Sequence, residues 1–175
     1  MSEMPRYNPA PNDLPLGQAP VAPPIMNTVF FMLIGAAVLH VIASIFGIMY
    51  ANSAQFREDA MKTFQDAKMT DIDESMVDTT VMVTVGTLIV MTVIAVILYV
   101  LIGLFLKKGM GWARIVGAIL AVVSLYQLMG LTMPGGIATI LQVLLGIGAM
   151  ILCFTGAGAK YFAEKKSFKL ANKMR

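Results

Sequence analysis

The sequence predicts an all-α membrane protein with four transmembrane helices and a short amphipathic external helix between the first two spans. The composition is the first reason, because 58% of the 175 residues are hydrophobic and only 13% are charged. A soluble domain carries about 25% charged residues. The second reason is that apolar runs long enough to cross a bilayer recur four times along the chain. The third reason is a short basic joint between two of these runs.

The basic joint occupies residues 107–114 and reads Lys-Lys-Gly-Met-Gly-Trp-Ala-Arg. One uncharged apolar run ends at Leu106 and the next begins at Ile115, so the two spans are antiparallel neighbours. Short loops rich in Lys and Arg stay on the cytoplasmic side of a membrane, and aromatic residues gather at the interface. The interface anchors that this predicts are Lys107, Lys108, Trp112 and Arg114.

The chain divides into three parts. Residues 1–24 hold seven of the eight prolines and predict a flexible cytoplasmic arm, because proline resists helix and sheet. Residues 159–175 form a basic cytoplasmic tail. Between them, residues 25–158 form the four-helix transmembrane domain, with spans at about 25–50, 79–106, 112–131 and 137–154 and an external loop at 51–78.

The charges place both termini on the cytoplasmic side of the plasma (inner) membrane. In this topology the cytoplasmic parts hold ten of the thirteen Lys and Arg residues, and the external parts hold three. The external loop is acidic. Its apolar residues recur every three or four positions, which indicates an amphipathic helix. A capping-box spacing from Thr70 to Asp73 predicts a second helix start that leads into the second span.

The sequence contains no catalytic constellation, cofactor motif or metal motif, so we expect no enzyme and no cofactor. A single Cys forms neither an internal disulfide nor a thiolate metal cluster within one chain. The acidic loop is interpreted as a solvated loop, with divalent-cation binding as the alternative, because it lacks the glycine-bearing EF-hand pattern. Nucleic acid is a poor partner because the basic tail is short and tethered to the membrane.

His40 is the one ionisable residue inside the first span, and polar groups in lipid are functional candidates. It either shuttles protons or is a neutral imidazole hydrogen-bonded to a neighbouring helix. Tyr126, Gln127 and Gln142 are the available partners. No Asp, Glu, Lys or Arg lies deep inside a span, which argues against an ion-coupled transporter.

Small residues at helical spacing predict faces where helices approach closely. Such faces either pack within the bundle or receive a helix from another protein. The arm has a similar pair of interpretations, an unstructured tail or a peptide that docks along a partner through Pro23 and Pro24. The packing positions that the spacing predicts are Ala43, Gly47, Ala113, Gly117 and Ala121.

The stretch from Lys107 to Val116 resembles the joint of small four-span actinobacterial membrane proteins, which is rich in Lys or Arg and continues as Gly and Trp-Ala-Arg-Ile. Those proteins also begin with a Pro-rich arm and end with a short charged tail. Their function is largely unknown, so the resemblance carries over no catalytic residue. By analogy of size and lineage, the resemblance suggests the accessory subunits of the actinobacterial cytochrome bcc–aa3 respiratory supercomplex.

We therefore expect a non-catalytic accessory or scaffolding subunit that packs against a larger membrane complex, with the respiratory supercomplex as one candidate. Its partners would be other integral membrane subunits and the anionic lipid of the inner leaflet, which attracts the basic tail. One alternative is a small oligomeric transporter or channel with His40 and Gln127 near its path. Another is an envelope or lipid-sensing protein that uses the acidic loop.

Overall fold

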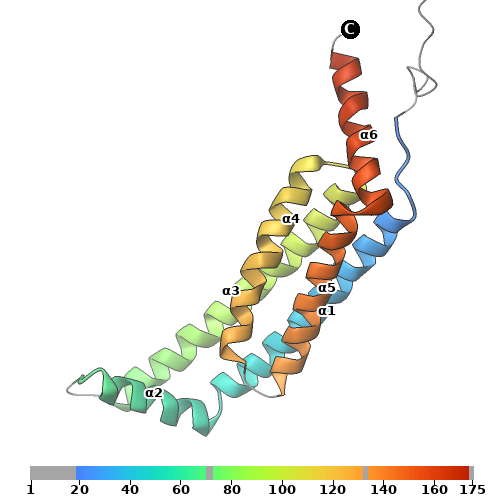
Figure 1. The fold of residues 1–175 in the computed structure, drawn as a ribbon. Helices are drawn as coiled ribbons and strands as arrows, with labels where there is room; N and C mark the ends of the chain where they lie inside the picture. The colour runs from blue at the N-terminus through green and yellow to red at the C-terminus, as the bar shows by residue number, and fades with distance from the viewer. Residues whose placement is uncertain (1–18, 70–72, 132–133, 174–175) are drawn as a thin grey trace, which may run out of the picture.

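The computed structural model describes residues 19–69, 73–131 and 134–173, and these ranges contain helices and no strand (Figure 1). Most of the arm lies outside the described residues. Four helical segments are long and apolar enough to cross a membrane, which confirms the predicted all-α chain with four span-length helices. The helices are α1 (Ile25–Ala51), α2 (Ala54–Asp66), α3 (Glu74–Lys107), α4 (Gly111–Ser124), its 3₁₀ continuation η1 (Leu125–Gly130), α5 (Gly135–Phe154) and α6 (Gly156–Lys173).

The connections between the long helices alternate between two ends of the bundle (Figure 1). At one end lie the start of α1, the joint between α3 and α4, and α6; we call it the basic end, for Lys107, Lys108, Arg114 and the lysines of α6. At the other end lie α2 and the starts of α3 and α5. We call it the acidic end, for the carboxylates of Glu58, Asp59, Asp66, Asp73, Glu74 and Asp78. Basic side chains therefore predominate at one end of the bundle and acidic side chains at the other, which is the distribution expected when the two sets of loops lie on opposite sides of a membrane.

Polar caps set where α2 and α3 begin. The Ser53 hydroxyl accepts a hydrogen bond from the Phe56 amide at 3.2 Å, and the Asp73 carboxylate accepts one from the Met76 amide at 3.0 Å. Each satisfies an N–H group that has no partner inside its helix. One continuous α3 follows Asp73 and begins five residues before the expected second span, so polar residues such as Asp78 belong to its first turns. Thr70 lies outside the described residues.

The basic joint is a tight helix ending built around a glycine. Gly109 has φ +74°, a conformation that L side chains rarely adopt. The Met110 amide donates to the Phe105 carbonyl at 3.0 Å, and the Gly109 amide donates to Leu106 at 2.9 Å. These two hydrogen bonds satisfy carbonyl groups in the last turn of α3 that have no partner within the helix. The next helix, α4, begins directly after Met110. The Gly-Met-Gly sequence thus turns the chain back on itself within a few residues.

The third span changes helix type, where one continuous helix was expected at 112–131. Its α-helical part ends at Ser124, whose hydroxyl donates to the Ala121 carbonyl at 2.7 Å, and η1 continues it. Fourteen residues at 1.5 Å and six at 2.0 Å per residue reach about 33 Å, enough to cross the hydrocarbon core. The change of helix type sets which face of the last turn meets α5.

The small residues are used inside the bundle. A Cβ added at Gly117 would lie 2.7 Å from the Met150 sulfur, and one added at Gly135 would lie 2.9 Å from Phe46. Ala113 is fully buried. The predicted packing positions contact other helices of this chain: Ala113 and Gly117 in the core, Ala121 beside it, Gly47 against Leu88 of α3, and Ala43 with its carbonyl toward Gly135.

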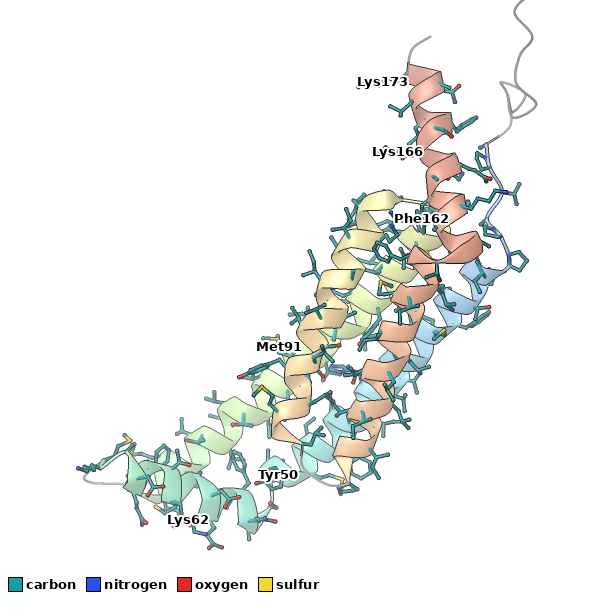
Figure 2. The ribbon with its side chains drawn as sticks, viewed as in Figure 1. Tyr50, Lys62, Met91, Phe162, Lys166 and Lys173 are labelled. Atoms are coloured by element: carbon teal, nitrogen blue, oxygen red, sulfur yellow. The ribbon has the colours of Figure 1, made fainter. Side chains whose placement is uncertain are left out.

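The tail forms α6, which extends past the basic end of the bundle rather than folding back across it (Figure 1). Its first turns are anchored: Tyr161 and Phe162 are buried, and the Tyr161 hydroxyl donates to the Lys107 carbonyl at 3.1 Å. Burial raises the pKa of the Tyr161 phenol, so it stays a neutral donor at physiological pH. Figure 2 shows Phe162 beside the bundle, with Lys166 and Lys173 farther out along the helix.

The arrangement predicts a labelling pattern for exposed positions in intact cells. In a Cys153→Ser background, Lys62→Cys at the acidic end should react with a membrane-impermeant maleimide, because that end faces outward in the positive-inside topology. Lys108→Cys and Lys169→Cys should react only with a permeant maleimide. Labelling of either position by the impermeant reagent would contradict the topology with both ends in the cytoplasm.

Candidate functional site

A cluster of polar side chains lies inside the bundle, centred on Gln142 of α5. Gln142 is only 1% exposed. Its Oε1 lies 3.1 Å from Nδ1 of His40 on α1, and its Nε2 donates to the Tyr99 hydroxyl on α3 at 3.2 Å. The same nitrogen donates to Oε1 of Gln127 on η1 at 3.4 Å. One side chain therefore joins four elements of the chain.

The hydrogen bonds fix the proton positions in this polar cluster. An amide oxygen only accepts, so Nδ1 of His40 must carry the proton in the bond to Gln142. A neutral His40 then keeps a lone pair on Nε2. The Tyr99 oxygen accepts from Gln142, so its own proton is free to be donated elsewhere. The cluster thus offers one unused acceptor and one unused donor, on rings whose centroids lie 6.4 Å apart.

A second polar link lies one helical turn from His40. The hydroxyls of Ser44 on α1 and Thr92 on α3 lie 2.6 Å apart, and Thr92 also donates to the Leu88 carbonyl at 2.7 Å. Because a hydroxyl has one proton, Ser44 supplies the proton between the two side chains. Two successive turns of α1 therefore hold polar contacts in the apolar bundle, and both join it to other helices.

Next to the polar cluster lies a cavity of about 140 Å³ between α3, α4 and α5. Its wall is apolar except at one end, where Tyr99, Ser124 and Gln127 supply polar atoms. A water molecule needs two to four polar partners, so this end can hold water and the rest favours an apolar group. The polar end of the cavity can bind a small polar group.

The structure brings together some of the residues that the sequence singled out. Gln142 is the direct partner of His40, while Gln127 reaches it through Gln142. Tyr126 is 77% exposed and takes no part. Sequence reasoning missed Tyr99, because a Tyr near the end of a span is usual for an aromatic belt. Its signal was weak: it is the one ring with a polar group in the apolar run of the second span.

The acidic end shows ion pairs rather than a metal site. Among the described residues, no group of three His, Cys, Asp or Glu side chains is placed to hold a metal ion. Asp78 pairs with Arg57 at 2.6 Å, and Glu58 pairs with Lys62 at 2.8 Å. The Glu58 carboxylate beside the Lys62 ammonium raises the pKa of that lysine. The Arg57–Asp78 pair joins α2 to α3, whereas the Glu58–Lys62 pair lies within α2.

The comparisons with known proteins add nothing to this geometry. The sequence matches no protein-family model, and it matches neither a curated protein nor a solved structure.

Because Gln142 has no access to water, Gln142→Leu should cost more stability than Gln127→Leu, whose residue is exposed. Each stranded partner costs roughly 1–2 kcal/mol. The loss of stability for His40→Leu should lie between those for Gln142→Leu and Gln127→Leu. The stability of His40→Gln should be close to that of the wild type, since Gln restores one hydrogen bond. Unfolding midpoints in a mixed-detergent titration measure this order. Equal midpoints for Gln142→Leu and Gln127→Leu would show that Gln142 is not the centre of the cluster.

Proposed function

We propose that the chain is a non-catalytic accessory subunit that packs against a larger membrane protein complex through α3. The observation that supports this most is the uncovered state of α3. No residue from 82 to 101 is buried, although these residues span about 30 Å, the thickness of the hydrocarbon core. Only 11% of the most apolar part of α3 is buried, against 39% for α5.

The length of α3 supports the same proposal. Its 34 residues reach about 51 Å, and even a tilt of 40° leaves about 39 Å along the membrane normal. The start of α3 therefore extends beyond the hydrocarbon core, where the Arg57–Asp78 pair joins it to α2. We propose that α2 is an amphipathic helix on the outer surface. In this proposal α2 and the Pro-rich arm are further docking elements, α2 on the outer side of the membrane and the arm on the cytoplasmic side.

Gly86 favours protein over lipid as the cover of α3. A glycine within a helix costs about 1 kcal/mol relative to alanine. Gly117, Gly135 and Gly148 each have a neighbour within 3 Å of an added Cβ, which explains their small size, but Gly86 has none within 4 Å. Exposed Val83 and Val90 lie one turn before and after it. Such a surface allows close approach of a helix from another protein.

In this proposal the protein lies in the plasma (inner) membrane with both termini in the cytoplasm and α6 near the anionic inner leaflet. The actinobacterial respiratory supercomplex is one candidate complex, by analogy of size and lineage and not through a shared motif. No described span has an ion pair or a carboxylate in its middle, so an accessory role fits better than ion-coupled transport.

The cavity beside Tyr99 supports a second candidate function, a small transporter or channel. The unused acceptor on His40 and the unused donor on Tyr99 would then lie along its path. The two functions differ in a reconstitution experiment. A transporter moves solute or protons when purified alone into liposomes, whereas an accessory subunit is inactive without its complex.

We expect Val90→Trp to reduce recovery of co-purifying membrane subunits in mild detergent, because the larger ring holds a partner helix away from α3. Leu144→Trp on α5 is the matched control, since the two side chains are similarly exposed, 56% and 60%. Subunit identification by mass spectrometry, with a visible haem spectrum, measures the result. Purification of the wild type as a lone monomer or homo-oligomer, active in liposomes, would contradict the proposal.

A further inference from the structure

A groove of about 380 Å³ runs between α4 and α5 on the outside of the bundle. Ala118, Val122 and Leu125 form one wall, and Ile147, Ile151 and Phe154 form the other. It is separate from the central cavity, although Ala121 and Met150 lie between the two and line both. The wall on α5 is about 10 Å long, because Ile147 and Phe154 are seven residues apart on this helix. The groove therefore has the shape and chemistry to hold a hydrocarbon chain.

Arg114 lies at the end of this groove that faces the basic end of the bundle. It is four residues before Ala118, so the two share one face of α4. Its guanidinium carbon lies 4.5 Å from the ring centroid of Phe154, which belongs to the groove wall, and 5.1 Å from that of Phe162 on α6. Two aromatic rings from two helices thus hold the cation in place.

This cation lacks an anionic partner in the part of the chain that the structure describes. The ion pairs there involve other residues, and the buried Nε of Arg114 has no hydrogen-bond partner. A buried N–H without an acceptor is costly, and the structure contains few such groups. Gly111, one turn before Arg114 on the same face, leaves open space around the start of α4. An external anion with acceptor oxygens would satisfy the guanidinium.

We propose that Arg114 and the α4–α5 groove bind one anionic phospholipid, with its phosphate on the guanidinium and an acyl chain between the helices. A planar guanidinium matches phosphate oxygens in two parallel hydrogen bonds. Anionic headgroups are preferred because the described residues at this end of the bundle include one carboxylate, Glu164, against eight cations. These cations are Lys107, Lys108, Arg114, Lys160, Lys165, Lys166, Lys169 and Lys173. The proposal requires membrane insertion only and is independent of the accessory role.

The test measures which lipid the full chain retains. The protein is reconstituted into vesicles of equal dioleoyl phosphatidylglycerol and dioleoyl phosphatidylcholine, extracted in mild detergent and examined by native mass spectrometry. The wild type should retain one phosphatidylglycerol in preference to phosphatidylcholine. Arg114→Gln should lower that retention about tenfold, because it removes charge-assisted hydrogen bonds to phosphate. Lys166→Gln, an exposed α6 residue outside the groove, is the charge-matched control and should retain the lipid.

A second pair of variants tests the groove without changing Arg114. Val122 is 67% exposed and lines the groove, so Val122→Trp should fill it, spare the fold and lower retention. Ile119→Trp changes a similarly exposed residue, 57%, that lies outside the groove. Equal retention of both lipids, or wild-type retention by Val122→Trp, would overturn the proposal. It would also be overturned if Lys166→Gln lost as much lipid as Arg114→Gln, since the attraction would then be diffuse.

Discussion

The hydrogen bonds of Gln142 are the constraint around which the bundle is arranged. In hydrocarbon a polar side chain must find its partners within the protein, and Gln142 is almost completely buried. Its partners come from α1, α3 and η1, so a shift of any of them along its axis would break a bond. Glycines let α1 and α5 approach: a Cβ added at Gly148 would lie 2.9 Å from the Met32 side chain, and one added at Gly35 would lie 3.4 Å from that of Leu145. The change from α4 to η1 belongs to the same arrangement, because it brings Gln127 to Gln142.

This arrangement leaves two apolar surfaces without a cover inside the chain. The bundle closes on α5, while α3 packs against α1, reaches α5 through Tyr99 and leaves its outer face open along residues 82–101. The groove between α4 and α5 is the second surface, and it differs from the first in having a cation at its end. The two proposals rest on this difference: the groove beside Arg114 would hold a phospholipid, and the face of α3 around Gly86 would receive another helix.

The sequence predicted the all-α class and the four span-length helices, because apolar run length is a strong signal. It named Gln142 only as one of three candidate partners of His40, and the fold selects among them. It did not predict which face of each helix turns inward. Lipid tails are as apolar as a protein core, so hydropathy is similar on both faces. The stripe of Ala113 and Gly117 indicated close packing but not the partner, which proved to be Met150 within the chain. The place of Tyr99 in the polar cluster and the direction of α6 depend on tertiary contacts that no local pattern carries.

The claim that α3 is an interface is tested most directly in the native membrane. A photoreactive benzoyl-phenylalanine placed at Val90 should, on irradiation of cells, give a covalent adduct with another membrane protein, because a helix of the partner covers that face. The same group at Leu144, on the exposed side of α5, should give lipid adducts and no discrete protein band. Lipid adducts alone at both positions would contradict the account and would show that α3 is a lipid-facing helix of a free-standing protein.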